Sequence, residues 1–309
     1  MEILIGHTGF VGSNLANQHQ FDAEYNSSNV IQAFGTNPEF CIYAGVRAEK
    51  FLAVKYPESD MEIIQNAISN IKNINPKRLV LISTIDVYPN PVGVNEKSPI
   101  MGDTAKAYGY NRRFLEKWVQ ENIQNHLIIR LPALFGKNLK KNFVFDLTNM
   151  IPAMLSADLF ECFASREPYI RGHYVLQNNG FYKLSADEAK KKQLGKVFES
   201  LGFSALNFTD SRASFQFYNL EYLWNHIQIA LENGLSLVNF AVEPITVADV
   251  YKNVRGKDFI NEISSNVVRY DIKSIYASLY KGTDGYIFRK EKVMYDICEF
   301  IRNEDRRIG

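Results

Sequence analysis

The chain has 309 residues, of which 46% are hydrophobic and 22% charged, and its formal net charge is +1. This composition indicates a packed globular protein with one large domain or two smaller ones. The near-neutral charge and the short basic clusters at 137–141 and 190–192 give no electrostatic footprint for nucleic acid, so we expect no nucleic-acid binding.

Cysteine usage and hydropathy limit the cellular context. Cys41, Cys162 and Cys298 lie far apart in the sequence, so neither a disulfide framework nor a zinc site is expected. The opening MEILIGHTGF lacks the basic region and apolar run of a signal peptide, and no stretch reaches the roughly 18 uncharged apolar residues of a membrane helix. We therefore expect a cytoplasmic protein without a membrane segment.

The first half of the chain alternates between short apolar runs and helical patterns. The strand EILI is followed by a glycine turn and a helix, SNLANQHQ. Further strands are predicted at 40–45, 79–84 and 126–131, with helices within 61–74 and 108–123. Apolar strands that alternate with helices predict an α/β fold, a Rossmann-type doubly wound parallel sheet buried on both faces.

The pattern changes after about residue 145. Residues 185–203 predict a separate helix that Ser185 and Glu188 open as a capping box. Residues 215–234 predict a strand and a helix, 236–241 predict another strand, and Pro244 and Thr246 introduce a further helix.

Two domains follow from this change of pattern. We expect an NAD(P)-binding Rossmann domain at 1–145 with a return segment near 213–242. A smaller α+β substrate-binding domain is expected at 146–212 and 243–309.

The glycine run Gly6, Gly9 and Gly12 directly follows a strand and opens a helix. In this context glycines permit a tight turn, let backbone N–H groups approach a pyrophosphate, and allow close packing of the helix on the sheet. The pattern therefore predicts a dinucleotide site, and the alternative is an ordinary glycine turn of an α/β protein.

The choice of dinucleotide depends on the end of the second strand. Dinucleotide sites often place an acidic residue there to hold the adenosine ribose. This chain has Asn26, Ser27 and Ser28 instead, and these neutral side chains would not repel a 2′-phosphate. The sequence favours NADP and leaves NAD open.

Four segments in order, GHTGFVG, ISTIDVY, YGYNR and IIRLPALFG, resemble the extended short-chain dehydrogenase/reductase family, the NAD-dependent epimerase/dehydratase group. The likeness covers the first 140 residues well, and residues 145–212 match only in outline. The resemblance implies Thr84 as the catalytic hydroxyl, with Ser83 as a neighbour able to share the task, and Tyr108 as the catalytic tyrosine. The residues expected at the cofactor are Gly6, Thr8, Gly9, Phe10, Val11, Gly12, Asn26, Ser27, Ala44 and Gly45.

Hydride chemistry at a carbonyl or alcohol suits this group of residues. A phenol with a pKa near 10 acts at neutral pH when an adjacent cation stabilises its phenolate, and residues four apart on a helix share a face. The cation of the family pattern Tyr-x-x-x-Lys is Arg112 here. Arginine keeps the charge but cannot relay a proton.

A second departure concerns the substrate. Sugar-nucleotide enzymes of the group usually have asparagine three residues after the arginine of IIRLPALFG, and this chain has Ala133. Tyr88, Asn142, Tyr218 and Asn219 are candidates for substrate contact, with packing as the alternative. Lys50 and Lys55, in a segment read as a loop at 48–60, either meet a phosphate or are solvated.

The expected function is an NAD(P)-dependent oxidoreductase or epimerase that acts on a nucleotide-activated sugar or a similar polar substrate, with Thr84, Tyr108 and Arg112 as the catalytic group. Within the family, a 4-keto reductase of the dTDP-4-dehydrorhamnose reductase group is slightly favoured over an epimerase. The alternative is a dinucleotide-binding sensor or assembly protein with impaired catalysis, motivated by Arg112 and Ala133. The partners are then a small-molecule substrate and, by resemblance, a second copy of the chain in a homodimer.

Overall fold

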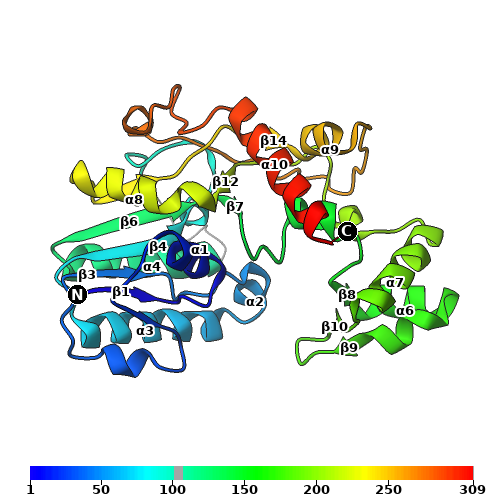
Figure 1. Cartoon of the computed structure of the whole chain (residues 1–309), viewed down its shortest axis with the longest axis horizontal. Helices are drawn as coiled ribbons and strands as arrows, with labels where there is room; N and C mark the ends of the chain where they lie inside the picture. Colours follow the sequence, from blue (N-terminus) through cyan, green and yellow to red (C-terminus); the bar gives the residue numbers. More distant parts are fainter. Residues whose placement is uncertain (101–106, 309) are drawn as a thin grey trace. The chain divides into compact units, whose positions relative to one another are not determined.

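A computed structural model describes residues 1–100 and 107–308, which form two compact units (Figure 1). The large unit comprises Met1–Leu139, Ser214–Ile245 and Val268–Ile297, and the small unit comprises Lys140–Ala213, Thr246–Val267 and Cys298–Gly309. The sequence placed all of 243–309 in the smaller domain, whereas residues 268–297 pack with the large unit.

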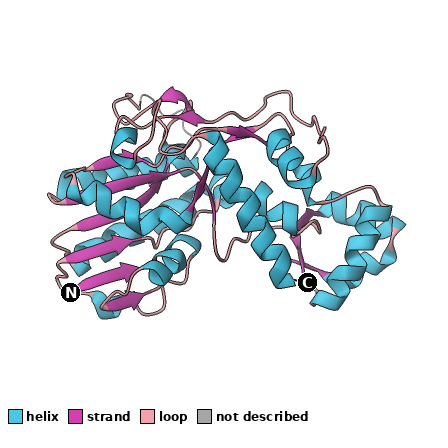
Figure 2. Cartoon of the chain, turned by 45° about the horizontal axis from the view of Figure 1, so that its top comes forward, coloured by secondary structure: helices cyan, strands magenta, loops and turns pink. Residues whose placement is uncertain are grey.

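A six-stranded parallel sheet forms the centre of the large unit (Figure 2). Its strand order is β13-β6-β4-β3-β1-β2. The strands are β1 (Glu2–Ile5), β2 (Ala23–Tyr25), β3 (Phe40–Tyr43), β4 (Leu79–Thr84), β6 (His126–Leu131) and β13 (Leu237–Asn239). The predicted Rossmann-type parallel sheet is confirmed.

The order of the strands creates a switch point at β1. After β1 the chain adds β2 on one side, then crosses back to add β3 on the other side. Connections that leave neighbouring strands in opposite directions open a crevice at the carboxyl ends of those strands, which is where doubly wound folds bind ligands. The carboxyl ends of β1 and β3 carry the glycine turn and Ala44–Gly45.

Helices cover both faces of this sheet. They are α1 (Phe10–Gln18), α2 (Lys50–Lys55), α3 (Pro57–Ile74), α4 (Ala107–Asn122) and α8 (Leu223–Glu232), with α3 against α4 and α1 against α8. The segment 48–60, which the sequence presented as a loop, is helical in α2 and the start of α3. Pro57 occupies the first turn of α3, where its missing N–H costs nothing.

The remaining elements of the large unit are short. The strands are β5 (Val92–Val94), β7 (Ala133–Phe135), β11 (Ser214–Phe215), β12 (Phe217–Asn219) and β15 (Asp271–Ile272), and the 3-10 helices are η1 (Val30–Ala33), η2 (Ile85–Val87), η5 (Leu220–Tyr222) and η6 (Ala277–Tyr280). Two elements cross the limit between the units, β14 (Ile245–Thr246) and α10 (Lys290–Ile308). The return segment predicted near 213–242 supplies α8 and the edge strand β13.

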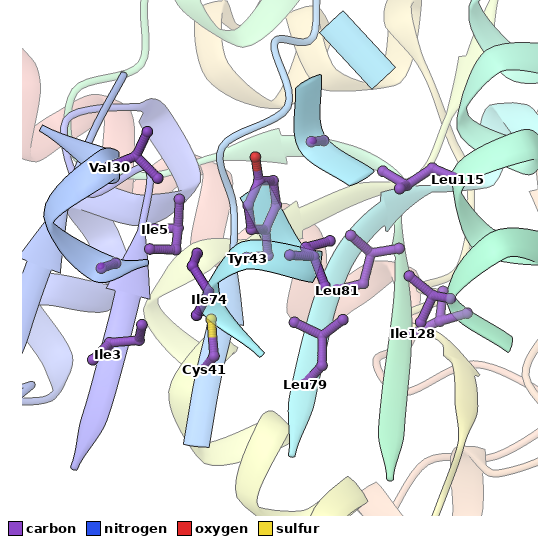
Figure 3. Packing of buried hydrophobic residues seen from close by; sticks show 14 of the residues in the cluster. Ile3, Ile5, Val30, Cys41, Tyr43, Ile74, Leu79, Leu81, Leu115 and Ile128 are labelled. Atoms are coloured by element: carbon purple, nitrogen blue, oxygen red, sulfur yellow. The ribbon is translucent and has the colours of Figure 1, made fainter. Parts of the chain in front are cut away.

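Burial of both faces of the sheet explains why the strand sequences are continuous apolar runs. Side chains alternate between the faces of a strand, and Ile3, Cys41 and Leu79 pack on the face that α3 and α4 cover (Figure 3). Their neighbours Leu4 and Ile42 point to the other face and are equally buried. Because both faces are covered, no strand position of this sheet needs to be polar.

The small unit mixes helices with a short antiparallel sheet of order β8-β10-β9. Phe160, Phe163 and Phe198 form its core with Leu155 and Leu194. Its elements are α5 (Phe143–Thr148), β8 (Met154–Ser156), α6 (Ala157–Arg166), η3 (Pro168–His173), β9 (Tyr174–Leu176), β10 (Phe181–Leu184), α7 (Glu188–Ser200), η4 (Ala205–Phe208) and α9 (Val247–Arg255). The α+β character expected for the second unit is present.

One of the two predicted helix caps is wrong. The N-cap of α7 is Asp187, whose carboxylate accepts from the Lys190 N–H at 2.9 Å, so Ser185 lies outside the helix. Asp187 outcompetes the serine because a carboxylate is also favoured by the helix dipole. Thr246 caps α9 as predicted, accepting from the Asp249 N–H at 3.1 Å.

His226 on α8 gives the large unit a defined acid sensitivity. Burial lowers the pKa of His226 from 6.5 to about 4. The unfolded chain therefore binds more protons between these values, and the free energy of unfolding falls as the pH drops through this window. At pH 5 we expect a loss of about 2 kcal/mol relative to pH 7.

Denaturant unfolding at both pH values measures this loss. His226→Gln, which stays neutral and can keep the hydrogen bond to Tyr218 Oη (2.8 Å), should remove that part of the pH dependence. An unchanged loss in the variant would assign the acid sensitivity to other groups.

Candidate active site

The glycine turn is closed so tightly that two of its positions exclude any side chain. A Cβ at Gly12 would lie 2.1 Å from Gly6 O, and one at Gly6 would lie 2.7 Å from the carbonyl carbon of Ala44. Gly6 also has φ +92°, in the region that glycine favours. The Gly9 N–H donates to Gly6 O at 2.9 Å and closes the turn.

The turn leads directly into α1 and leaves its N-terminus without a side-chain cap. Gly9 is the N-cap residue, and the first turn of α1 contains no acidic residue. The buried Nδ1 of His7, inside the turn, has no hydrogen-bond partner. Free backbone N–H groups and the positive end of the helix dipole suit a phosphate group.

Asn26 and Ser27 follow the carboxyl end of β2, at the edge where the glycine turn lies. The Asn26 side-chain oxygen accepts from the Ser28 N–H at 2.8 Å and from the Ser28 hydroxyl at 2.6 Å. Ser27 is exposed. The tip of this loop therefore presents neutral polar groups and no carboxylate.

Ala44 and Gly45 follow the carboxyl end of β3, on the other side of β1. The Ala44 N–H donates to Ile5 O at 2.9 Å, which continues the parallel ladder up to the glycine turn. A Cβ at Gly45 would lie in ordinary contact, 3.4 Å from the side chains of Ile5 and Tyr43. The close approach restricts Gly6 instead, because a Cβ there would lie 2.7 Å from Ala44 C and 2.8 Å from Gly45 Cα.

Tyr108 and Arg112 lie on one face of α4, as their spacing predicts. The guanidinium carbon of Arg112 lies 4.0 Å from the centroid of the Tyr108 ring. The guanidinium is already engaged, because it forms an ion pair with Asp60 of α3 and donates to Arg47 O. Arg112 and Asp60 are both buried, which makes this pair a fixed part of the interior.

The environment of Tyr108 favours its protonated form. Burial raises the pKa of Tyr108 from 10 to about 12; the charge of Arg112 opposes this shift, and the carboxylates of Asp86 and Asp60 add to it. Arg112 lowers this pKa, as its charge leads one to expect, but burial raises it by more. Burial destabilises the phenolate more than the guanidinium of Arg112 stabilises it, because the carboxylate of Asp60 offsets the charge of the guanidinium.

Thr84 ends β4 and belongs to a polar cluster that the sequence did not reveal. Its hydroxyl donates to Asp86 Oδ2 at 3.0 Å and accepts from the Asp86 N–H at 3.1 Å. The same carboxylate accepts from the Tyr270 hydroxyl at 2.7 Å and pairs with Lys50 Nζ at 2.5 Å. Lys50 Nζ lies 5.9 Å from the centroid of the Tyr108 ring, which brings the cluster next to the tyrosine.

Sequence could have found part of this cluster. Asp86 lies in ISTIDVY, two residues after Thr84, and an aspartate beside a candidate catalytic hydroxyl was a usable signal. Tyr270 comes from a distant segment that no motif marks. The sequence left Lys50 between a phosphate contact and solvation; in the structure it lies on α2, is 57% exposed and pairs with Asp86.

Ser83 turns to the opposite side from Thr84 and joins a buried network. Its hydroxyl donates to Glu116 Oε1 at 2.6 Å, and Arg130 donates to both oxygens of that carboxylate at 2.9 and 2.6 Å. Arg130 also donates to the Tyr88 hydroxyl at 2.8 Å. This network ties β4, α4 and β6 together, and the Ser83 hydroxyl is engaged in it.

The four residues considered for substrate contact have structural roles. Tyr88 is buried in the Arg130 network, and Tyr218 is fully buried against His226. Asn219 caps η5 by accepting from the Glu221 N–H at 3.0 Å, and Asn142 caps α5 by accepting from the Phe145 N–H at 3.1 Å. Packing and capping account for all four.

Arg112→Lys is expected to destabilise the protein, because one ammonium cannot replace both contacts of the guanidinium. Asp60 would keep one cationic partner, but Arg47 O would lose its donor. We expect the free energy of unfolding to fall by about 1–3 kcal/mol. Denaturant unfolding measures it, with Arg113→Lys on the half-exposed face as the control, and equal values for the two variants would contradict this account.

The class of protein defined by the sheet and its glycine turn is the Rossmann-type α/β fold. The family model described as the NAD dependent epimerase/dehydratase family matches residues 22–158. The resemblance drawn from the sequence motifs is thereby confirmed. The glycine turn lies just before the matched residues.

Solved structures share the fold over the whole chain. A UDP-glucose 4-epimerase with UDP-glucose from Thermotoga maritima is 11% identical, with 100% of each chain covered and a TM-score of 0.62. A dTDP-4-dehydrorhamnose reductase from Bacillus anthracis in complex with NADP is 14% identical, with 98% of this chain and 99% of that chain covered and a TM-score of 0.62. The protein RMD from Pseudomonas aeruginosa, complexed with NADPH, is 13% identical, with 98% and 100% covered and a TM-score of 0.60.

At these identities the likeness shows the fold alone. None of the curated proteins matches this sequence.

Among residues 1–100 and 107–308, no helix combines the length and the apolar character that a membrane span requires. The same described residues contain no cluster of three or more His, Cys, Asp or Glu side chains suited to a metal ion.

Proposed function

We propose that this protein is an NAD(P)-dependent oxidoreductase or epimerase that acts on a nucleotide-activated sugar or a similar polar keto or hydroxy substrate. The observation that carries the proposal is the glycine turn at the switch point, where Gly6 and Gly12 have no room for a Cβ and the N-terminus of α1 has no side-chain cap. The family match and the epimerases and reductases that share the fold support the choice of reaction and substrate.

The residues of the turn fit a dinucleotide. Backbone N–H groups from Phe10 to Gly12, in the first turn of α1, would hold the pyrophosphate, and Thr8 is exposed beside them. Asn26 and Ser27 would meet the adenosine ribose, and their neutral side chains favour NADP. Ala44 and Gly45 would lie against the bound cofactor.

A bound nicotinamide supplies or accepts the hydride, and the protein handles the proton. The Thr84 hydroxyl would orient the substrate oxygen, and Tyr108 would donate a proton to it or accept one from it. A tyrosine held protonated at neutral pH is suited to the reductive direction, in which the substrate oxygen gains a proton.

Calorimetry with NADP(H) and NAD(H), followed by fluorescence of the reduced cofactor with a panel of nucleotide keto-sugars, tests the proposal. We expect binding of at least one dinucleotide and oxidation of its reduced form by a member of the panel. Absence of binding would overturn the dinucleotide site itself.

A second candidate is a dinucleotide-binding sensor or assembly protein with impaired catalysis. The commitment of Arg112 to Asp60 favours it, because the cation of the catalytic pair is neutralised inside the protein. Tight dinucleotide binding without turnover on any member of the panel would support this candidate over the enzyme.

A further inference from the structure

The proposed reaction requires a path by which Tyr108 recovers its proton from solvent. Tyr108 is 6% exposed and Arg112 is 4% exposed, so neither exchanges freely with bulk water. A guanidinium remains protonated throughout the accessible pH range and cannot pass a proton on. The helical partner of Tyr108 therefore supplies charge and ring stacking but not proton transfer.

Among the described residues, Lys50 on α2 is a second cation at the Tyr108 ring. Its Nζ lies 5.9 Å from that ring centroid and 5.6 Å from the centroid of the Tyr270 ring. The ion pair with Asp86 Oδ2 at 2.5 Å fixes this position, while the Lys50 side chain is 57% exposed. Lys50 thus reaches from the buried tyrosine to solvent.

The charged and titratable groups around Lys50 come from η2, α3, α4 and the segment that precedes β15. Asp86 of η2 is its counterion, and the Tyr270 hydroxyl, 3.5 Å from Nζ, is held by the same carboxylate. Tyr108 and Arg112 face it from α4, with Asp60 of α3 behind Arg112. Of these cations, only an ammonium can lose a proton and regain it from water.

We propose that Lys50, positioned by Asp86, is the proton relay between Tyr108 and solvent in place of the lysine that Arg112 replaces. The inference rests on the proposed function. In the reductive direction the substrate carbonyl carbon receives hydride from the reduced dinucleotide, and its oxygen receives the Tyr108 proton. The phenolate then takes a proton from the Lys50 ammonium, directly or through one water, and the resulting amine is reprotonated by solvent.

Two substitutions separate a relay from a structural ion pair. Lys50→Met removes the charge, and Lys50→Arg keeps the charge and the bond to Asp86 but cannot relay. We expect both to lower kcat at pH 7 by about 10–100-fold with dinucleotide affinity unchanged. The matched control is Lys55→Met on the same helix, which should keep the wild-type rate. In the wild-type protein Lys55 Nζ lies 5.4 Å from the centroid of the Tyr56 ring.

The pH profile and chemical rescue give readouts that a structural role would not move. Without the relay, the phenolate must be protonated from solvent, so kcat of Lys50→Met should rise as the pH falls through a range in which the wild-type rate is flat. Methylamine added to Lys50→Ala should restore turnover in proportion to its concentration. Wild-type behaviour of Lys50→Arg, or no rescue by methylamine, would overturn the relay.

A measurement without turnover tests the contact itself. Reductive methylation with ¹³C-formaldehyde labels the lysines, and the Lys50 signal is assigned by its loss in Lys50→Arg. Tyr108→Leu should move the Lys50 signal, because the ring current of Tyr108 is lost, and leave the Lys55 signal in place. An unmoved Lys50 signal would overturn the relay even in an active enzyme, whereas a wild-type protein that oxidises no reduced dinucleotide would overturn the proposed function and the relay together.

Discussion

Tyr108→Phe is expected to lower kcat by about 10²–10⁴-fold on a substrate that the wild-type protein turns over, with dinucleotide affinity unchanged. The substitution removes only the hydroxyl that exchanges a proton with the substrate oxygen. The phenyl ring remains in the interior and keeps its contact with the guanidinium carbon of Arg112, 4.0 Å from the ring centroid in the wild-type protein. The loss therefore reports on the hydroxyl and not on the packing of α4.

Tyr110→Phe is the matched control for this prediction. Tyr110 lies two positions further along the same helix and is 45% exposed, whereas Tyr108 is 6% exposed. It should retain wild-type turnover. Denaturant unfolding of both variants should show changes of less than about 1 kcal/mol, because a single hydroxyl is removed in each. Equal turnover of Tyr108→Phe and the wild-type protein would remove Tyr108 from the mechanism.

The sequence predicted those features of the fold that depend on local pattern. The apolar runs around Ile3, Ile42 and Val80 identify strands buried on both faces, and the structure confirms the parallel sheet that they imply. The spacing of Tyr108 and Arg112 likewise predicts a shared helical face, because the period of a helix is a local property. Such inferences need no knowledge of distant parts of the chain.

The charge environment of the candidate site could not be predicted in this way. How far the pKa of Tyr108 rises depends partly on Asp60, which lies 52 positions from Arg112 in sequence and takes the guanidinium as its partner. The contact of Tyr270 with Asp86 spans 184 positions. Tertiary packing decides these pairs, and the burial that opposes ionisation of Tyr108 follows from the same packing.

The predicted bounds of the second unit differ from the observed ones for a related reason. Residues 268–297 carry no pattern that marks a return to the sheet unit, and β15 joins it through a pairing of only two residues with β5. Short pairings of this kind are stabilised by their surroundings, since two strand residues have little intrinsic preference. The sequence therefore assigned this segment to the smaller domain by position alone.

Gly12→Ala is expected to weaken dinucleotide binding at the glycine turn strongly. The new Cβ would lie 2.1 Å from Gly6 O and 2.7 Å from Gly6 C, and both are backbone atoms that cannot move aside as a flexible side chain would. Either α1 shifts outward or the turn opens, and each change moves the backbone N–H groups that would hold the pyrophosphate. We expect dinucleotide affinity to fall on the order of 100-fold and the free energy of unfolding to fall by about 1–3 kcal/mol.

Gly9→Ala tests whether the cause is this contact or glycine content in general. A Cβ at Gly9 would lie 3.2 Å from Gly6 O, a tight contact that a shift of a few tenths of an ångström relieves, and Gly9 has the ordinary φ of −75°. Calorimetry should show a much smaller loss of affinity for Gly9→Ala than for Gly12→Ala. Equal losses would mean that backbone flexibility, and not the close approach of α1 to β1, is what the turn requires. Unchanged affinity in both variants would place the dinucleotide elsewhere. If the turn held the pyrophosphate, distorting the turn would weaken binding.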